Sequence, residues 1–544
     1  MALIPILNLL LDPLRFARPG APGRRAGVAL GALAALAALA VCSALAGCSP
    51  QDDTARTDDA TEPASSASVP TEEPDTGWRY IRIRASAADA AASPASMAAR
   101  ASQDPRLAQP GAAATPASAA ASAPPATPPD AATRRPAVKA AAADTDAATL
   151  ARGRYLAHAG DCAACHDAAD HTPYAGGQPV NSPFGPIYAP NITPDPTHGI
   201  GHYTLQQFDD ALRRGVRADG SRLYPAMPYP SFARLSADDV RALYAYFMRG
   251  VAPSANAAHA TRLPFPFNQR WALALWRVAF ASDARFEPQP SRSAEWNRGA
   301  YLVQGLGHCG ACHTPRGPGF NERGYDERSA AFLTGGINDH WFAPNLTGAA
   351  ADGLGRWSAD DIATFLRSGH AARGAVFGAM APVVGESTAL LTDADRHAIA
   401  VYLKSLPARP TAATNPLGVG TARLTAAGPR PEGGQQAPGA GVYAGFCARC
   451  HGADGQGVRD HGPPLADNPV VLAADPTSTI RIVVEGARPA PGKDDPSTRM
   501  PAMRGTLTSR DIAAVVSYVR GGWGNRAAPV SEQDVRRLRA AIHQ

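Results

Sequence analysis

A five-residue motif, Cys-x-x-Cys-His, occurs three times in this chain of 544 residues and constrains its fold more than any other feature. The chain has eight cysteines, of which two lie in an apolar N-terminal segment and six lie in the three motifs. The motif residues are Cys162, Cys165, His166, Cys309, Cys312, His313, Cys447, Cys450 and His451. Since the main body has no other cysteine, the motifs account for all of the thiol chemistry there.

The spacing within the motif is typical of covalent haem attachment. Two cysteines three positions apart can form thioethers with the two vinyl groups of one haem, and the adjacent histidine then binds the iron as proximal ligand. A zinc half-site, a redox dithiol and a disulfide are the alternatives for a single pair. Zinc usually needs a second pair at a fixed distance, and these pairs are more than a hundred residues apart. None of the alternatives explains a histidine at the same position three times, so the sequence predicts three covalently bound haem c groups.

Each motif lies within a longer repeat, and the repeat predicts the fold. Apolar residues at helical spacing precede each pair of cysteines. A loop and then a helix follow, and these helices begin near Leu205, Ile362 and Ile480. A glycine after each of them fits a left-handed C-terminal cap. These glycines are Gly215, Gly369 and Gly486.

A methionine-containing loop and a closing helix complete each unit. The closing helices are expected at residues 240–248, 399–406 and 512–519. Each is preceded by Ser or Thr with Asp three positions later, which predicts an N-terminal cap. The pairs are Ser236 with Asp239, Thr392 with Asp395, and Thr508 with Asp511. This order of elements predicts a mainly α fold of three tandem small domains, each with a core too thin to be complete without its prosthetic group.

Methionines in these loops are the candidates for the sixth ligand of each iron. Met227 and Met380 are single choices at matching places in units one and two, whereas unit three offers Met500 or, as the alternative, Met503. A thioether ligand raises the reduction potential, and His/Met ligation leaves no open position on the iron. The pattern therefore favours electron transfer over oxygen activation. Met248 lies in a closing helix and is expected to pack in the apolar core of its domain.

Three histidines near the motifs have no assigned role. His158, His308 and His461 are expected in loops or on the surface. A second axial histidine stays open as an alternative for each of them.

The N-terminus has the pattern of an export signal. Arg24 and Arg25 precede an apolar run over residues 26–47, as charged residues precede the hydrophobic part of a secretory signal. The run ends in Leu-Ala-Gly before Cys48, which resembles a lipoprotein signal whose cysteine becomes lipidated. A run of about 20 apolar residues is also long enough to span a bilayer uncleaved. Residues 1–48 are therefore predicted to export the main body, as a signal peptide, a lipoprotein anchor or a retained membrane helix.

Composition divides the rest of the chain. Residues 49–146 consist largely of Ala, Pro, Ser, Thr and Asp, which cannot bury enough apolar surface to offset the entropy of ordering, so a disordered linker is predicted. An island at residues 78–84 alternates like a strand and is either a docking segment or an isolated apolar patch. A net charge of only +5 does not favour binding to nucleic acid. The remaining predicted segments are domain one at 147–255, an interdomain segment at 256–292, domain two at 293–410, a second linker at 411–434 and domain three at 435–541.

From about residue 148 to residue 541 the chain resembles the three-haem cytochrome c subunits of membrane-associated bacterial dehydrogenases. The likeness extends beyond the haem motifs. It is carried by Gly-Gly at 176–177, Pro-Phe-Gly at 183–185, Ala-Pro-Asn-Ile-Thr-Pro-Asp at 189–195, Gly-Ser-Arg-Leu-Tyr-Pro-Ala-Met-Pro-Tyr-Pro at 220–230, Ser-Ala-Glu-Trp-Asn-Arg-Gly-Ala-Tyr-Leu at 293–302 and Asn-Pro-Val-Val-Leu at 468–472. It implies three class I cytochrome c domains, with Met227, Met380 and Met500 as the methionine ligands of haems one, two and three. The long N-terminal segment departs from the short cleaved signal usual in that family.

The resemblance also implies partners. The chain is expected to accept electrons from a catalytic subunit of the quinoprotein, flavoprotein or molybdenum type, which oxidises an alcohol, sugar, sugar acid or N-heterocycle. The electrons then pass to ubiquinone or another respiratory acceptor on the periplasmic side of the inner membrane, or of the outer membrane for a lipoprotein. The aromatic-rich residues 263–286 are expected to form a helix packed on the haem domains, with a contact to the dehydrogenase or the membrane as the alternative.

Two other functions stay open. One is a self-standing haem enzyme, like a thiosulfate dehydrogenase or a peroxidase, which needs an open or unusual axial position on one iron. The other is an electron carrier that serves a terminal oxidase. The matching methionine loops in all three units argue against the enzyme.

Overall fold

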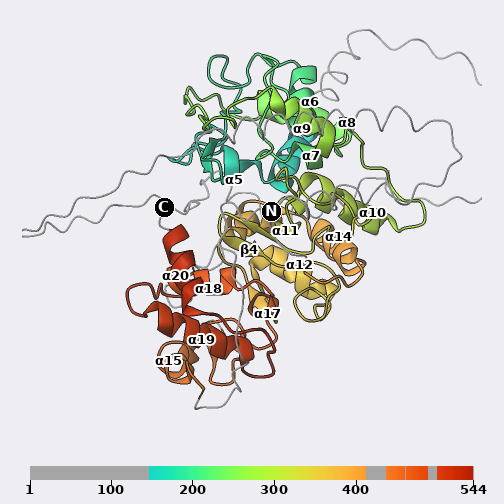
Figure 1. Cartoon of the computed structure of the whole chain (residues 1–544). Helices are drawn as coiled ribbons and strands as arrows, with labels where there is room; N and C mark the ends of the chain where they lie inside the picture. Colours follow the sequence, from blue (N-terminus) through green and yellow to red (C-terminus); the bar gives the residue numbers. More distant parts are fainter. Residues whose placement is uncertain (1–145, 412–436, 460, 488–498, 543–544) are drawn as a thin grey trace, which may run out of the picture. The chain divides into compact units, whose positions relative to one another are not determined.

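A computed structural model describes residues 146–411, 437–459, 461–487 and 499–542 (Figure 1). The predicted export signal with Cys48, the island at residues 78–84 and most of both linkers lie outside the described residues. The described part of the chain is mainly helical, as the repeat predicts, with three short antiparallel hairpins. None of the helices described there combines the length and the apolar character needed to cross a membrane.

Domain one begins with a helix over residues 146–159, which leads into the first motif. Its other elements are α5 (Cys162–His166), β1 (Pro179–Val180), β2 (Ile187–Tyr188), α6 (Leu205–Arg214), α7 (Tyr229–Phe232) and α8 (Ala237–Arg249). Strands β1 and β2 pair antiparallel. A capping box between Thr204 and Gln207 starts α6, and Gly215 ends it at φ 62° and ψ 37°, the predicted left-handed conformation.

Domain two repeats this order. Its elements are α10 (Ala294–Tyr301), η4 (Leu302–Leu306), α11 (Gly310–His313), β3 (Gly336–Asn338), β4 (Trp341–Ala343), α12 (Ala359–Ser368), β5 (His370–Ala371), β6 (Gly374–Ala375), α13 (Met380–Glu386), η5 (Thr388–Leu390) and α14 (Asp393–Lys404). Gly369 ends α12 at φ 72° and ψ 7°, again left-handed as predicted. Met380 opens the helix α13 instead of lying in a loop, because Ala381 and Val384 form a buried apolar face on one turn.

The π-helical turn η4 accommodates one extra residue. Arg298 and Cys309 are eleven positions apart, whereas the corresponding residues of domain one, Arg152 and Cys162, are ten apart. A π-helical turn holds more residues than an α-helical turn and often marks such an insertion. The extra residue is therefore absorbed between the start of the repeat and the haem motif.

Within domain one, and again within domain two, the first helix crosses the last helix at a glycine of the first helix. A Cβ atom on Gly153, in the helix at residues 146–159, would overlap the carbonyl oxygen of Ala242 in α8. In domain two, a Cβ atom on Gly299 would overlap the carbonyl oxygen of Ala398 in α14. Only glycine lets the two backbones approach this closely. The repeated Gly-x-Tyr-Leu phrase thus sets the helix crossing.

Domain three departs from the other two in its second half. Its elements are α15 (Ala440–Phe446), α16 (Ala448–His451), α17 (Pro469–Leu472), α18 (Thr477–Glu485), α19 (Ser509–Gly521) and α20 (Glu532–Ala541). The prediction of a left-handed helix end at Gly486 is wrong, because φ is 75° but ψ is −175°. The extended ψ leads the chain directly into a backbone bridge between Ala487 and Met500. Sequence reasoning missed α20, whose Val535 and Leu538 are fully buried.

The apolar cores follow two patterns. Domains one and two share one continuous cluster, to which Leu156 and Leu235 contribute from domain one and Leu302 and Leu306 from domain two. Domain three has a separate cluster around Ile512. Since burying one such side chain contributes about 1.5–3 kcal/mol, the shared cluster joins the first two domains far more firmly than isolated surface contacts would.

The interdomain helix α9 (Ala272–Phe280) has one packed face and one exposed face. The indole N–H of Trp276 donates to the carbonyl oxygen of Gly319 at 2.6 Å, so this side packs on domain two. The prediction of a helix packed on the haem domains is right for this face and wrong for the rest, because no residue of α9 is buried. The apolar side chains exposed by 42 % to 80 % in and before α9 are Phe265, Phe267, Trp271, Leu275 and Val278.

Candidate haem sites

The same contact fixes the orientation of each motif histidine. The Nδ1 atoms of the three histidines lie 2.8, 2.7 and 2.9 Å from proline carbonyl oxygens. The pairs are His166 with Pro190, His313 with Pro344, and His451 with Pro463. Because a carbonyl oxygen only accepts, Nδ1 carries the proton and donates, which leaves the lone pair of Nε2 free for a metal. Each histidine is therefore oriented as an iron ligand needs.

Burial lowers the pKa of all three histidines, and the hydrogen bond to the proline carbonyl partly offsets this effect. A lowered pKa keeps the imidazole neutral at pH 7, and neutral imidazole is the form that binds iron.

Sequence reasoning missed the proline carbonyls, although a signal was present. The phrase Ala-Pro-Asn-x-Thr occurs at residues 189–193 and again at residues 343–347. In both copies the buried asparagine, Asn191 or Asn345, accepts a hydrogen bond from the amide two residues later and donates its own amide to a distant backbone carbonyl. The repeated asparagine thus holds the loop that presents the proline carbonyl.

The motif cysteines fit haem attachment. All six are free thiols, and each pair lies on one turn of backbone together with its histidine, at α5, α11 and α16. Free thiols are the groups that form thioethers with haem vinyl groups. Two thiols and an imidazole with a free Nε2 on one helical turn are the donor set that haem c requires.

The candidate methionine ligands are all half-buried. Met227 and Met380 are half-buried against the shared core of domains one and two, and Met500 is half-buried in domain three. Met503, the alternative, is only 8 % exposed and belongs to the apolar core of domain three. This packing accounts for Met503 without a ligand role and supports Met500. The assignment of all three methionines to iron stays a prediction.

The three unassigned histidines have different surroundings. His461 is exposed, as predicted, whereas His158 is half-buried on its helix. His308 lies in the loop before α11, as predicted, but it is half-buried, and its Nε2 atom lies 3.3 Å from the carbonyl oxygen of Gly160 in domain one. Its ring also meets the edge of Phe232 at a centroid distance of 5.5 Å. His308 faces domain one because the turn before the second motif packs on that domain.

The first two motifs lie near each other. The helix α5 of motif one contacts α13, which begins with Met380. The contact between His308 and Gly160 joins the residues directly before the two motifs. The attachment points of haems one and two are therefore adjacent.

Comparison with known proteins defines the class of the chain. The sequence profile of the cytochrome c family matches residues 150–250, 297–407 and 436–523. These three ranges correspond to the three helical domains. The chain belongs to the cytochrome c family, and each domain carries a Cys-x-x-Cys haem-binding motif.

Individual relatives narrow the assignment. The chain is 48% identical over 402 residues to the cytochrome c subunit of the quinone-type alcohol dehydrogenase of Komagataeibacter europaeus, which covers 73% of this chain and 85% of that protein. It is 46% identical over 410 residues to the gluconate 2-dehydrogenase cytochrome c subunit of Pantoea cypripedii, covering 74% and 92%. It is 39% identical over 417 residues to the fructose dehydrogenase cytochrome subunit of Gluconobacter japonicus, covering 73% and 84%. Within the family, this chain is one of the electron-transferring cytochrome c subunits of membrane-bound bacterial dehydrogenases.

The protein supplies the surroundings that tune a bound haem. Haem c would supply a one-electron iron couple, and here the motif thiols would anchor it and the oriented imidazole would bind its iron. The proline carbonyl makes the imidazole a stronger electron donor by accepting the Nδ1 proton in a hydrogen bond. Because this contact recurs at all three motifs, we expect the proximal side to be alike and differences in potential to arise elsewhere.

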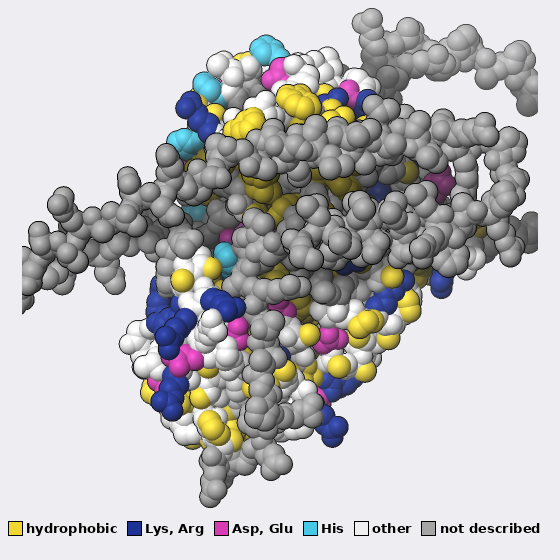
Figure 2. All heavy atoms as spheres, viewed as in Figure 1, with side chains coloured by type: hydrophobic (Ala, Val, Ile, Leu, Met, Phe, Trp, Pro, Cys, Tyr) yellow, Lys and Arg dark blue, Asp and Glu magenta, His cyan; other side chains and the backbone are white. Residues whose placement is uncertain are grey.

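Domain three presents basic side chains to solvent. Exposed arginines lie next to its methionine loop, at the start of α19 and along α20. They are Arg504, Arg510, Arg536 and Arg537. Figure 2 shows arginine side chains, in dark blue, on the visible face of this domain. An acidic surface of a redox partner would be complementary to this face.

Proposed function

We propose that this chain accepts electrons from the catalytic subunit of a membrane-bound dehydrogenase and passes them through three haems to ubiquinone or another respiratory acceptor. The observation that carries the proposal is the high identity to cytochrome c subunits of alcohol, gluconate and fructose dehydrogenases over most of the chain. The three oriented histidines and the half-buried methionines support closed His/Met ligation, which suits electron transfer.

The same likeness supports a proposal for the partner and its substrate. The relatives are named for oxidation of an alcohol, a sugar acid and a sugar, and a further relative belongs to a nicotinate dehydrogenase. We therefore propose a catalytic subunit of the quinoprotein, flavoprotein or molybdenum type on the periplasmic side of the membrane. The exposed arginines around the methionine loop of domain three are the proposed electrostatic contact for a redox partner.

A reduction assay tests this function. The holoprotein with three haems is mixed with one catalytic subunit of each type, and ethanol, gluconate, fructose or nicotinate is added. We expect haem reduction with one of these pairs, followed by reoxidation when a short-chain ubiquinone is added. The absence of haem reduction with every pair would contradict the proposal.

Carbon monoxide separates electron transfer from haem catalysis. With His/Met ligation at all three irons, the reduced holoprotein should give no carbon monoxide spectrum. A bound ligand at one haem, together with turnover in the absence of a partner, would support the self-standing enzyme instead.

We further propose that the exposed face of α9 rests on the membrane surface and that Cys48 provides a lipid anchor. Exposed Trp, Phe and aliphatic side chains on one short segment are typical of interfacial contacts, and one acyl chain alone holds a protein only marginally. In a Cys48→Ala background, Leu275→Gln combined with Val278→Gln should reduce binding to phosphatidylethanolamine/phosphatidylglycerol vesicles. Leu205→Gln, at an exposed apolar residue of α6, is the matched control and should have no effect. Unchanged vesicle binding by the α9 variant would contradict the contact.

A further inference from the structure

Each of domains one and two contributes one tyrosine that binds the other domain. The hydroxyl of Tyr155, in the first helix of domain one, donates to Asp395 Oδ2 of domain two at 2.6 Å. The same hydroxyl oxygen accepts a hydrogen bond from the backbone N–H of Thr392 at 3.2 Å. Thr392 is the N-cap of α14, and Asp395 is the third residue of that helix. The tyrosine therefore lies between the two groups that begin the closing helix of the other domain.

The reverse contact has the same form. The hydroxyl of Tyr301, in α10 of domain two, donates to Asp239 Oδ2 of domain one at 2.5 Å. It accepts a hydrogen bond from the backbone N–H of Ser236, the N-cap of α8, at 3.2 Å. Tyr155 and Tyr301 occupy the same place in the Gly-x-Tyr-Leu phrase of their repeats. The two domains thus hold each other through one contact used twice in opposite directions.

An arginine of the same domain fixes each carboxylate. Arg152 donates to Asp239 through Nε at 3.0 Å and through Nη2 at 2.5 Å. Arg298 binds both oxygens of Asp395, at 2.8 and 2.7 Å. The side chain of Asp239 is 3 % exposed and that of Asp395 is 11 % exposed, so both carboxylates are shielded from water. Each tyrosine therefore binds a carboxylate of the other domain, and an arginine of that other domain already holds the carboxylate in place.

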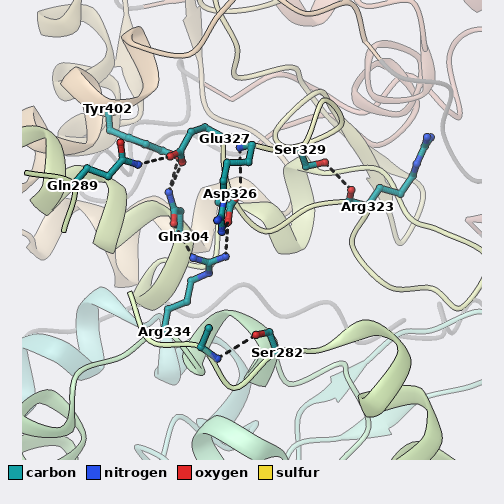
Figure 3. A network of polar contacts seen from close by, with 11 residues as sticks. Arg234, Ser282, Gln289, Gln304, Arg323, Asp326, Glu327, Ser329 and Tyr402 are labelled. Atoms are coloured by element: carbon teal, nitrogen blue, oxygen red, sulfur yellow. Dashed lines mark hydrogen bonds and ion pairs between the residues drawn. The ribbon is translucent and has the colours of Figure 1, made fainter. Parts of the chain in front are cut away.

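A third polar contact supports the pair of tyrosines. Arg234, in the loop before α8, donates to Gln304 Oε1 at 3.1 Å and to Asp326 Oδ2 at 3.0 Å, both in domain two. Gln304 lies in η4 and continues the network to Glu327 and Tyr402 (Figure 3). This network reaches the turn that directly precedes the second haem motif, so the contact between the domains extends to the haem attachment point.

We propose that Tyr155 and Tyr301 are positioning residues that fix the spacing of haems one and two for electron exchange. Each tyrosine lies on the helix that leads into its own haem motif and binds the closing helix of the other domain. Because the two contacts point in opposite directions, together they resist sliding and hinging of one domain against the other. The proposal deepens the electron-transfer function and rests on it.

The test compares holoproteins that carry all three haems. The variant is Tyr155→Phe combined with Tyr301→Phe, which removes both hydroxyls and keeps the rings. Tyr244→Phe is the matched control, since its hydroxyl donates to the carbonyl oxygen of Tyr203 at 2.9 Å within domain one. Pulsed electron paramagnetic resonance of the oxidised irons gives the distances between haems, and light-triggered reduction of the isolated protein gives the rate of exchange between them.

We expect the double variant to keep three haems and unchanged axial ligation while the narrow distance between haems one and two broadens and their electron exchange slows. Hydrogen exchange in the contact between the domains should accelerate by about 100-fold, because each lost hydrogen bond to a carboxylate changes an opening equilibrium by about tenfold or more. The Tyr244→Phe control should match the wild type in all three measurements.

Wild-type distances and exchange rates in a double variant with three haems would overturn the proposal. If the double variant binds fewer haems, each single variant should broaden the distance to a smaller extent, and unchanged single variants would equally overturn it. Light delivers the electrons directly to the isolated cytochrome. A failure of every dehydrogenase to reduce the chain would therefore contradict the proposed function without changing this result.

Discussion

The closing helices of domains one and three begin with the same residue pattern and use it differently. In domain three, Thr508 and Asp511 form a complete capping box, in which the Asp511 carboxylate accepts the backbone N–H of Thr508 at 3.1 Å. In domain one, the backbone N–H of Ser236 donates instead to the hydroxyl of Tyr301 from domain two. The tyrosine hydroxyl thus takes the place that the helix's own carboxylate takes in domain three.

The difference shows how a local motif becomes a contact between domains. A closed capping box satisfies the helix within its own domain and leaves domain three attached to domain two by smaller contacts. One of these is the pair of hydrogen bonds between Ser478 Oγ and the backbone of Phe342, both at 2.9 Å. Domains one and two instead share a core and two tyrosine contacts. We therefore regard the chain as a firmly joined pair of haem domains followed by a more independent third domain.

Removal of the haem-attaching cysteines should give the largest difference between domain three and the pair formed by domains one and two. Replacing Cys447 and Cys450 by Ser should cost only haem three, because domain three has its own core. Replacing Cys309 and Cys312 by Ser should also reduce attachment at the first motif, because domains one and two share a core. Intact mass and haem content per chain measure both outcomes. Loss of one haem in each variant would show that the three domains mature independently.

Substitution of the carboxylate at the helix start should give the next largest difference. Asp239→Asn and Asp395→Asn each remove a shielded carboxylate that an arginine and a tyrosine hydroxyl both bind, so we expect the free energy of unfolding to fall by about 3 kcal/mol. Asp511→Asn removes only an exposed cap and should cost much less. Chemical unfolding of the holoproteins measures these values. Equal losses at all three positions would remove the distinction between the domains.

Alkaline pH should weaken the contact between domains one and two through Tyr301. Burial raises the pKa of Tyr301 to about 12, and the neighbouring Asp239 adds to the shift. A raised pKa in the folded protein means that this stabilisation is complete below the ordinary tyrosine pKa of about 10 and is lost as the pH rises through the folded value. The free energy of unfolding should therefore fall by about 2–3 kcal/mol across this window, because each pKa unit corresponds to about 1.4 kcal/mol.

The Tyr301→Phe variant provides the control for the pH measurement. It should be less stable at pH 8 and should have a flatter alkaline slope than the wild type. At acid pH, burial raises the pKa of Asp395, but its bonds to Arg298 and Tyr155 outweigh burial and lower the pKa overall. That contribution is present above the ordinary carboxyl pKa and is lost as the pH falls through the folded value. An identical alkaline slope in both proteins would contradict the assignment to Tyr301.

The smallest effect is expected at an ion pair between domains two and three. Arg356 and Asp467 form an ion pair and are 32 % and 55 % exposed. Such partly exposed pairs contribute less than about 1 kcal/mol, so Arg356→Gln should change the free energy of unfolding only slightly. Arg234→Gln, in the buried network of domains one and two, is the contrasting variant and should cost more. A larger loss for Arg356→Gln would mean that domain three is held more firmly than its contacts indicate.

Much of each domain was predictable from the sequence because its signals are local. The helix order, the caps at Ser236, Thr392 and Thr508, and the left-handed ends at Gly215 and Gly369 depend on residues a few positions apart. The haem motifs are also local, since five consecutive residues supply the thiols and the proximal ligand. The three repeats and their motifs predicted the number of domains and the cofactor, which the comparisons confirm.

The contacts between domains were not predictable in the same way. The tyrosine at position 301 lies 62 residues from its carboxylate partner at position 239, and nothing in a single repeat indicates that the partner belongs to another domain. The proline carbonyls lie 12 to 31 residues from their histidines and needed a folded loop to bring them together. Gly486 shows the same limit, because a bridge to the distant Met500 decides its backbone conformation.

The wide turn η4 also explains how duplicated haem domains can tolerate changes in length. One residue inserted into an ordinary α-helix rotates everything after it by about 100° around the helix axis. By confining the insertion to a single turn, domain two keeps Tyr301 in contact with domain one before the turn and keeps Cys309 on the short helical turn of its own motif after it. An insertion of this kind can thus persist after duplication, since neither of the two interfaces that flank it has to be rebuilt.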